Sequence, residues 1–353
     1  MYRCELFNMY ARSFVSFFML DKGATITDDY LSPRKFDIDA PADLECEVRN
    51  TITIKDGKTT VYNGYIDNIA REKDKTVLTV APLVMLLNEQ SIQNVSSTDW
   101  RSQLRNQIWW DFTQATPSLY SIPFYRYSDT STANWDGVIV PYGAVLKNDM
   151  ECVLLRAKTF GKFLYFGMAV ETAWLGVPHY GFRKFTGTAK FDADFDNVID
   201  KEIVESSQNG KNILIIWMPS ENDPTNYVHY DCVLLDDGTI ETTGTHKSDV
   251  SEPRLVTKVE NEYTPMSSSE LYAQAVQNLK PSADNLNIKL TYKKGDKIGR
   301  PEDRIIGYPS EIYSNGKTYK TYLTGKIYNR DTITLVFGMT RQGLTEQLNS
   351  EED

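Results

Sequence analysis

The stretch NGKTYKTYLTGKIYN, residues 315–329, decides which fold the sequence indicates. It holds Gly316, Lys317 and Thr318 in a row, as a nucleotide-binding loop would. A phosphate loop also needs a glycine five residues before the Gly-Lys pair, so that backbone N–H groups can surround the phosphates. That position is Glu311, whose carboxylate would repel phosphate. Asn-Gly between strand-like residues instead predicts a two-residue hairpin turn, because both residues tolerate a positive φ.

A similar phrase lies near the start of the chain. The sequence DGKTTVYNGYIDN, residues 56–68, also places Asx-Gly-Lys-Thr before a strand, and Ile52 stands where a phosphate loop would need glycine. Each phrase continues through Gly-x-Ile-x-Asn, at 64–68 and 325–329, to a turn and a Thr-led strand. The shared order of these features predicts an internal duplication. We expect two similar small β-barrels, one at each end of the chain.

The hydrophobic pattern divides the chain into three regions. Residues 1–97 alternate apolar and polar side chains between turn residues, which is typical of β-structure. Residues 98–255 are mixed α+β, with a helical pattern after Thr98 and room for two subdomains. Residues 256–353 begin with a helix and return to strands. The expected fold is mainly β with an α+β insert, and the buried face of the helix should hold Leu271, Ala275 and Leu279.

The composition indicates a folded, soluble protein. The chain of 353 residues is 41% hydrophobic and carries a net charge of −10, which disfavours a nucleic-acid-binding surface but lets DNA pass without adhering. The apolar run Phe14–Leu20 is too short to span a bilayer and predicts a strand. The cysteines form no C-x-x-C pair and are expected to be buried free thiols, as in a reducing cytoplasm: Cys4, Cys46, Cys152 and Cys232.

The sequence predicts no metal site. The segment DADFDN, residues 192–197, places Asp at the first, third and fifth positions of a calcium loop. However, Asn197 replaces the glycine of such a loop and Ile203 replaces its glutamate. The Phe and Asp alternation favours a strand with one acidic solvent face. The histidines are far apart and lack metal-ligand spacing: His179, His229 and His246.

No catalytic motif is present either. There is no G-x-S-x-G elbow and no G-x-G-x-x-G loop, and Cys232 lies in the apolar run DCVLL, which is typical of a core strand. Glu171, Asp231 and Asp236 are surface acids by default, because glycosidase carboxylates are recognised only by their separation in space. Exposed aromatics such as Trp135 can stack on sugars, although they more often anchor a core or an interface. We therefore expect no catalytic residue and no cofactor.

Over essentially its whole length the chain resembles the hub proteins at the tail tip or baseplate of tailed bacteriophages, including the N-terminal part of tail-associated lysin proteins. The resemblance shows in LDKGATITDDYLSPRKFDIDAP (20–41) and GYIDNIAREKDKTVLTVAPLVMLL (64–87). It is clearest in IIGYPSEIYSNGKTYKTYLTGKIYNRDTITLVFGMTRQGLTEQL (305–348). The positions that carry the family signature are expected to serve assembly: Gly64, Ile66, Leu323, Gly325, Phe337, Gly338, Gly343, Leu344 and Thr345.

This resemblance implies a homotrimer whose two tail-tube-like barrels per chain continue a sixfold tail tube. It implies hexameric distal tail or tail-tube proteins, a tape-measure protein and a tip fibre or receptor-binding protein as partners, with genomic DNA only in transit. The expected location is the virion, after assembly in the host bacterial cytoplasm. Many relatives carry C-terminal peptidase, glycosidase or receptor-binding modules, and none is expected here because the chain stops at NSEED.

Two functions follow from these observations. The first is a structural hub without enzymatic activity, which closes or extends the tail tube, joins ring-forming tail proteins to the tip and guides the exit of DNA and tape-measure protein. The alternative is a cell-wall-directed glycosidase or peptidase, or a carbohydrate-binding module, with its site in the middle region.

Overall fold

The computed structural model describes residues 1–89, 125–126, 150, 154, 163–168, 175–182, 185, 187–205, 212–220, 223–235, 240–242, 256–261, 265–279 and 286–338. The helix expected after Thr98 lies outside these segments, as do other residues considered above: Trp135, Cys152, Glu171, Asp236, His246, Gly343, Leu344 and Thr345. Within the described segments no helix is long and apolar enough to cross a membrane.

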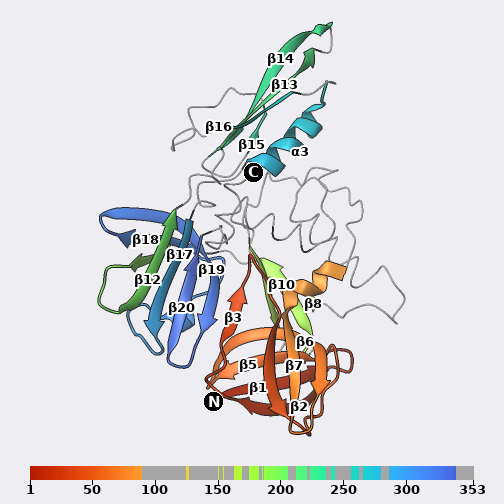
Figure 1. Cartoon of the computed structure of the whole chain (residues 1–353), viewed down its shortest axis with the longest axis vertical. Helices are drawn as coiled ribbons and strands as arrows, with labels where there is room; N and C mark the ends of the chain where they lie inside the picture. The colour runs from red at the N-terminus through yellow and green to blue at the C-terminus, as the bar shows by residue number, and fades with distance from the viewer. Residues whose placement is uncertain are drawn as a thin grey trace.

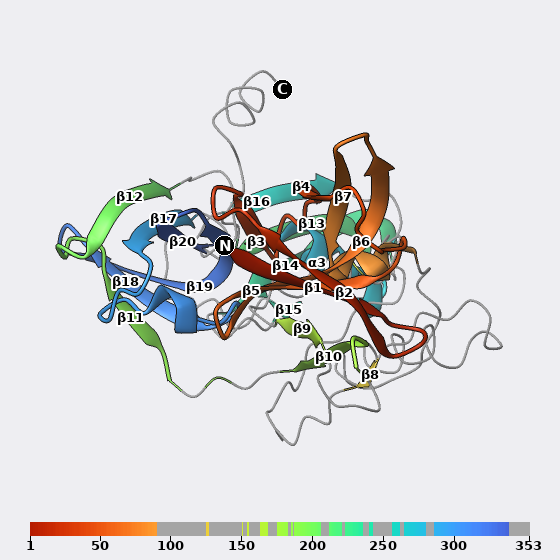
Figure 2. The same ribbon diagram turned by 90° about the horizontal axis from the view of Figure 1, so that it is seen from below.

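The first ninety residues form a six-stranded antiparallel sheet that curls around its own core (Figures 1 and 2). Alternation along the strands puts Cys4, Ile52 and Leu78 on the inner face, where each is fully buried. The strand predicted at Phe14–Leu20 is present as part of β2. In spatial order the strands are β2 (Ser13–Leu20), β1 (Tyr2–Asn8), β5 (Thr51–Asp56), β6 (Thr59–Arg71), β7 (Lys75–Pro82) and β4 (Phe36–Pro41).

The second sheet combines strands that are far apart in sequence. Strand β3 (Ile26–Asp29) crosses from the first ninety residues to pair with the second half of β19. Strand β11 joins β18 in parallel, and the other pairs of this sheet are antiparallel. In spatial order its remaining strands are β11 (Ala189–Asp192), β18 (Pro309–Ser314), β19 (Lys317–Tyr328), β20 (Thr332–Phe337), β17 (Leu286–Lys293) and β12 (Val198–Glu205).

Four strands follow the same order in the two sheets. In each, three consecutive strands form an antiparallel meander, β5–β6–β7 or β18–β19–β20. In each, a strand that precedes the meander, β4 or β17, pairs with its third strand. Each set of four strands is in a Greek-key order. The expectation of two similar barrels stays a prediction. The mainly β fold is confirmed.

The second sheet does not follow the expected division of the chain. Strands β11 and β12 come from residues 189–205, within the region 98–255 that was expected to form the insert. They extend the second sheet at its two ends. Such long-range strand pairing has no local sequence signal, whereas the meander does.

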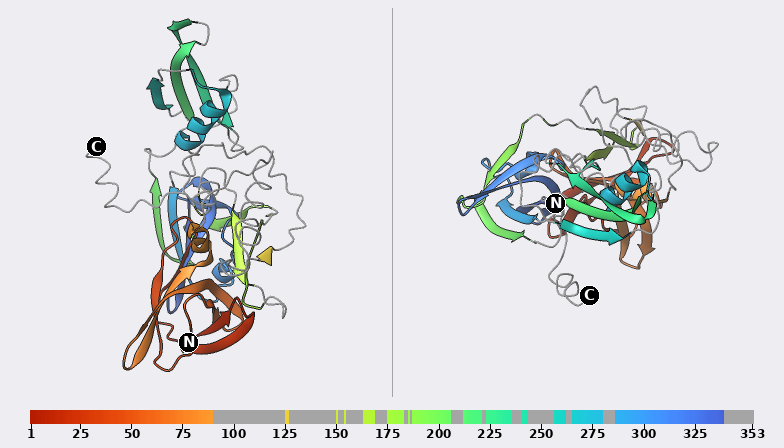
Figure 3. Two further views of the ribbon diagram at one scale, coloured as in Figure 1. Left: turned by 90° about the vertical axis from the view of Figure 1, so that its right-hand side faces the viewer. Right: turned by 90° about the horizontal axis from the view of Figure 1, so that it is seen from above.

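A small sheet with one helix projects from the two larger sheets (Figures 1 and 3). Helix α3 (Ser268–Asn278) begins with a capping box between Ser267 and Glu270. The predicted helix is confirmed, and it buries the expected residues Leu271, Ala275 and Leu279. The sheet holds, in spatial order, β15 (Ile240–Glu241), β14 (Asp223–Leu234), β13 (Ile213–Ser220) and β16 (Val256–Asn261).

A three-stranded sheet and a 3₁₀ helix lie beside the first sheet. The 3₁₀ helix η1 (Leu83–Glu89) follows β7 directly and contacts β9. The strands of this sheet are, in spatial order, β8 (Tyr125–Arg126), β10 (Pro178–Phe182) and β9 (Leu164–Met168).

Both Gly-Lys-Thr phrases lie at hairpin turns, as predicted. The first connects β5 to β6 and the second connects β18 to β19. Gly57 has a φ of 60° and Gly316 a φ of 79°, the left-handed conformation that glycine adopts most easily. Neither glycine opens a helix, so the backbone N–H groups that a phosphate loop needs are not arranged here.

The strand expected over residues 192–197 is a wrong prediction. Strand β11 ends at Asp192, whose carboxylate accepts the N–H of Asp194 at 2.9 Å and so forms an Asx turn. The carboxylate of Asp194 then accepts the N–H of Asn315 at 2.6 Å and the hydroxyl of Ser314 at 3.0 Å. The acidic residue therefore ties this turn to the β18–β19 hairpin, because local side-chain hydrogen bonding overrides the alternating pattern.

Candidate functional site at the junction of the two sheets

Two glycines of the expected signature stand where neighbouring strands come close. A Cβ atom at Gly64 would lie 2.5 Å from the carbonyl oxygen of Ala81. A Cβ atom at Gly325 would lie 3.1 Å from the carbonyl oxygen of Asp28, on the crossing strand β3. Both positions therefore favour glycine because of a close backbone approach.

The other described signature residues also serve packing. Ile66, Leu323 and Phe337 are buried. Gly338 has a φ of 92°, and a Cβ atom there would lie 1.8 Å from the carbonyl oxygen of Leu286. No larger residue fits this position without moving the backbone. These residues define the fold and contribute no reactive group.

Strand β3 places a carboxylate beside a buried lysine. Asp28 pairs in register with Lys326 of β19. Lys326 is 7% exposed, and its ammonium donates a hydrogen bond to the carbonyl oxygen of Glu302 at 3.2 Å. Within the described residues it forms no ion pair with a carboxylate. Burial lowers the pKa of Lys326 to about 8 and raises the pKa of Asp28 to about 6.

A second polar cluster joins the two sheets and is fully paired. The ammonium of Lys294 donates to the hydroxyl of Tyr2 at 2.5 Å and lies 3.5 Å from the carboxylate of Asp56. Lys22 pairs with the same carboxylate at 2.8 Å. The Tyr2 hydroxyl in turn donates to the carbonyl oxygen of Asn329 at 3.3 Å. This cluster fixes the first sheet against the second.

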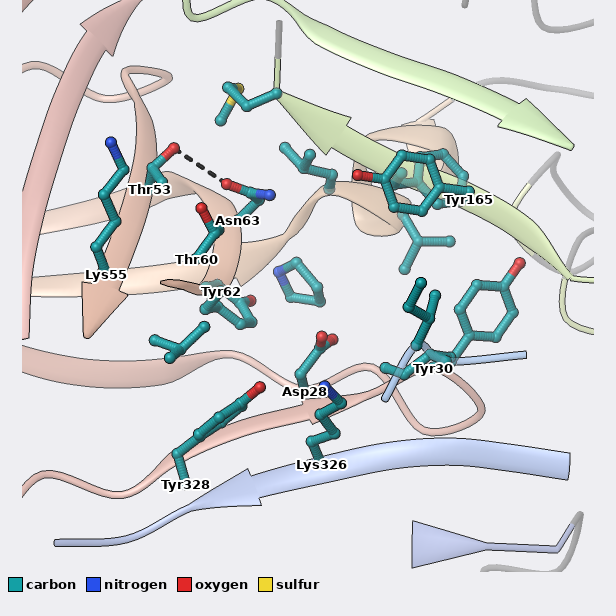
Figure 4. Close-up of a pocket in the computed structure, with 18 of the residues that line it drawn as sticks. Asp28, Tyr30, Thr53, Lys55, Thr60, Tyr62, Asn63, Tyr165, Lys326 and Tyr328 are labelled. Carbon is teal, nitrogen blue, oxygen red and sulfur yellow. Dashed lines mark hydrogen bonds between the residues drawn. The ribbon is translucent and has the colours of Figure 1, made fainter. Parts of the chain in front are cut away.

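A cavity of about 510 Å³ lies at the junction, between the β5–β6 hairpin, strand β9 and strands β3 and β19 (Figure 4). Its polar side carries Asp28, Lys326 and Tyr62. The Tyr62 hydroxyl is buried and has no hydrogen-bond partner among the described residues. No described donor reaches the half-buried carboxylate of Asp28. The opposite side is apolar, with Leu83, Val84, Phe163, Phe166, Met168 and Ile306.

Several other polar groups that line the cavity are already paired. Thr53 donates to the side-chain oxygen of Asn63 at 3.0 Å (Figure 4). Lys55 forms an ion pair with Glu5 at 2.7 Å. The Tyr30 hydroxyl accepts a backbone N–H at 3.0 Å. The three groups on the polar side differ from these paired groups in having capacity for a ligand.

Of the residues that sequence reasoning considered for chemistry, those that the structure describes do not meet in a site. Asp231 lies in the projecting sheet, 3.8 Å from the exposed His229. His179 lies in β10, beside the ring of Tyr165. Among the described residues no group of three or more His, Cys, Asp or Glu side chains is placed to hold a metal ion.

The described cysteines are buried free thiols, which confirms the prediction for Cys4, Cys46 and Cys232. Burial raises the pKa of Cys4 and of Cys232 to about 12. Their thiols therefore stay protonated and unreactive at neutral pH.

Sequence reasoning missed Asp28, Lys326 and Tyr62. The available signal was the difference between the two repeats. After the repeat glycine the first copy has Tyr65 and the second has Lys326, a charged residue in the second half of β19, which is otherwise largely buried.

These features define a fold that is shared with phage tail and baseplate proteins. No protein-family model matches the sequence, and no curated protein matches it in sequence. The structural likeness nevertheless extends over nearly the whole chain.

Three solved structures illustrate the likeness. The chain is similar to the 43 kDa tail protein of prophage MuSo2 from Shewanella oneidensis (TM-score 0.50, 13% identity, 89% of this chain and 92% of that one). It is similar to a chain of the phage P2 baseplate in its activated conformation with Ca (TM-score 0.51, 11% identity, 96% and 98%). It is similar to the prophage tail protein gp18 from Listeria monocytogenes EGD-e (TM-score 0.50, 6% identity, 99% and 98%). At these identities the likeness establishes the fold.

Proposed function

We propose that this protein is a structural component of a phage tail, the hub of its tip or baseplate. The observation that carries the proposal is a fold shared over nearly the full length with phage tail and baseplate proteins. The repeated strand order adds a geometric reason. One chain with two similar sheets offers two similar positions in a ring, so a homotrimer offers six, which suits a sixfold tail tube.

The exposed apolar residues support a ring of this kind. One group lies on β2, at one end of the pair of large sheets, and consists of Phe14, Phe17 and Met19. The other lies around β11, β12 and β18, at the opposite end (Figures 1 and 2), and consists of Phe195, Ile199 and Tyr313. Each group is a candidate interaction surface, because clustered exposed apolar residues mark such sites. Contact between two different patches at opposite ends is heterologous, and such contacts close rings.

In this role the protein closes or extends the tail tube and joins hexameric distal tail or tail-tube proteins to the tip. It guides the exit of the tape-measure protein and of DNA, whose passage the net charge of −10 favours by preventing adhesion. A tip fibre or receptor-binding protein is a further proposed partner. The proposed location is the virion, with assembly in the host bacterial cytoplasm.

The mass of the native assembly tests the proposal. We expect three chains, and we expect Phe17→Asp to reduce the assembly to single chains while the strand content seen by circular dichroism stays unchanged. Ile298→Asp is the control, because Ile298 is 63% exposed and lies outside both patches. A wild-type chain that stays monomeric at high concentration contradicts the trimer.

The proposal assigns no catalytic activity to the chain. Incubation of the purified protein with bacterial cell walls should release no soluble fragments. Lytic turnover would instead favour the alternative of a cell-wall-directed enzyme.

A further inference from the structure

We infer that the cavity at the junction of the two sheets binds a short peptide segment, whose backbone amide meets Asp28, Lys326 and Tyr62 and whose aliphatic side chain fills the apolar side. The inference rests on the lining of the cavity and is independent of the proposed hub function.

The first argument is the concentration of incompletely paired polar groups at one place. Tyr62 is 2% exposed and its hydroxyl has no partner among the described residues. Lys326 is 7% exposed and donates only to one backbone carbonyl oxygen. A buried polar group without a partner costs about 1–3 kcal/mol. Tyr62 is such a group, and Lys326 and the half-buried Asp28 keep capacity for further hydrogen bonds, so a ligand at this place would complete the hydrogen bonds of all three.

The second argument concerns the charge of the ligand. Lys326 and Arg304 lie along the cavity beside Asp28, Glu302 and Asp303, so both signs are present. The whole lining holds five carboxylates and four cations, so a carboxylate or phosphate ligand would meet like charges, and so would an ammonium ligand. A neutral group that both donates and accepts hydrogen bonds suits this lining best.

A peptide unit has these properties. Its carbonyl oxygen can accept from the Lys326 ammonium and the Tyr62 hydroxyl, while its N–H can donate to the Asp28 carboxylate. These three side chains lie on strands β19, β6 and β3, so the two sheets would hold the peptide jointly (Figure 4).

The third argument is the shape of the remaining space. The volume of about 510 Å³ is in the range of ligand-binding pockets. Its apolar side would leave the hydroxyl groups of a sugar without partners, which is costly. The same side accommodates a leucine-like side chain through contacts with Leu83, Val84, Phe163 and Met168.

The experiment titrates the full chain with N-acetyl-leucinamide, which has one aliphatic side chain and peptide-like amides. We expect saturable one-to-one binding and a rise of the melting temperature with probe concentration. Tyr62→Phe, which removes only the unpartnered hydroxyl, should weaken binding about three- to tenfold. Tyr10→Phe is the matched control, because Tyr10 is 55% exposed and is not among the lining residues.

Several outcomes would overturn the inference. They are the absence of saturable binding, equal affinity in Tyr62→Phe, and tighter binding of N-acetylglucosamine than of the peptide probe. A crystal soaked with the probe gives a second measurement, since density outside the cavity also contradicts the inference. The native mass remains a separate readout, because a monomer that binds the probe would contradict the hub proposal alone.

Discussion

The two hairpins share the sequence Asx-Gly-Lys-Thr, but its residues occupy different positions in the two turns. In the first, Gly57 and Lys58 are the two central turn residues, and only Gly57 has a positive φ. In the second, the central residues are Asn315 and Gly316, and both have a positive φ. The first is typical of a type II′ turn and the second of a type I′ turn. Relative to the centre of the turn, the phrase Asx-Gly-Lys-Thr is therefore shifted by one residue between the two hairpins.

This offset changes which residues correspond. By sequence, the buried Ile54 aligns with Tyr313, which is 45% exposed. Counted from the centre of each turn, Ile54 corresponds to Ile312, and both are fully buried. Because a shift of one residue moves every side chain to the other face, the turn centre is the correct reference. In the strand before each turn, the position of the buried isoleucine relative to the turn centre is therefore repeated, whereas its position relative to the Asx-Gly-Lys-Thr phrase is not.

The largest expected effect tests whether the two sheets are equivalent at their third strands. Leu78 pairs with Ile38 on β4, and Leu335 pairs with Leu290 on β17; both leucines are fully buried. Leu78→Asp and Leu335→Asp should each lower the free energy of unfolding by more than about 4 kcal/mol, because each buries an unpaired charge. Urea denaturation measures both. A loss below about 1 kcal/mol in one sheet would show that the sheets are not equivalent.

The next prediction tests the offset directly. Ile54→Ala and Ile312→Ala should each cost about 3 kcal/mol, since each opens a cavity in a closed core. Tyr313→Ala, at the position that aligns with Ile54 by sequence, should cost less than about 1 kcal/mol because the side chain is exposed. Midpoints of urea unfolding rank the three variants. If Tyr313→Ala costs as much as Ile312→Ala, correspondence by turn centre is wrong.

A smaller effect is the pH dependence of stability that Asp28 adds to the second sheet. The pKa of Asp28 is raised to about 6, so between about pH 4 and 6 the folded chain binds more protons than the unfolded chain. The free energy of unfolding should therefore fall as pH rises through this window, by about 1 kcal/mol after solvent screening. Asp28→Asn should remove this dependence.

Lys326 should act in the opposite direction at higher pH. Its pKa is lowered to about 8, so the unfolded chain binds more protons between about pH 8 and 10. Stability contributed by Lys326 should therefore rise with pH across that window, and Lys326→Met should abolish the rise. Urea denaturation at about pH 4, 6, 8 and 10, the limits of the two pH windows, gives the free energy of unfolding of both variants and the wild type. Parallel curves for all three would contradict the assignment.

The smallest effect concerns the turns themselves. Gly316→Ala should cost about 1 kcal/mol, because alanine is strained at a φ of 79°. Lys58→Ala, at the same place in the first turn, should change stability by less than about 0.5 kcal/mol, since Lys58 is not in the left-handed region. Thermal unfolding of the two variants measures the difference. ATP titration should show no binding to the wild type. ATP binding that Lys58→Ala abolishes would instead show that the first Gly-Lys-Thr segment is a phosphate-binding loop.

The sequence predicted those parts of the fold that local signals encode. Asx-Gly turns located both hairpins, and the capping residues and apolar spacing located the helix at 267–279. The places of β3, β11 and β12 in the second sheet could not be predicted, because their partners are about 80 to 300 residues away. The sequence of a single strand does not indicate which distant strand it pairs with.

The candidate site was beyond prediction for the same reason. Asp28, Tyr62 and Lys326 come from three strands that only the folded chain brings together. Tyr62 also sits in an ordinary alternating strand, where its hydroxyl gives no sign of lacking a partner. The burial of packing residues such as Phe337 could be predicted, since an apolar residue in an apolar strand is usually buried.

The pairing of strand β3 with β19 has a consequence for folding during synthesis on the ribosome. Asp28 is made among the first residues, and its partner Lys326 follows about 300 residues later. At a synthesis rate of 5–20 residues per second, β3 waits roughly 15 to 60 seconds for the edge it must join. During this interval its backbone is an open template for strands of neighbouring nascent chains. Its length of only four residues keeps that risk small.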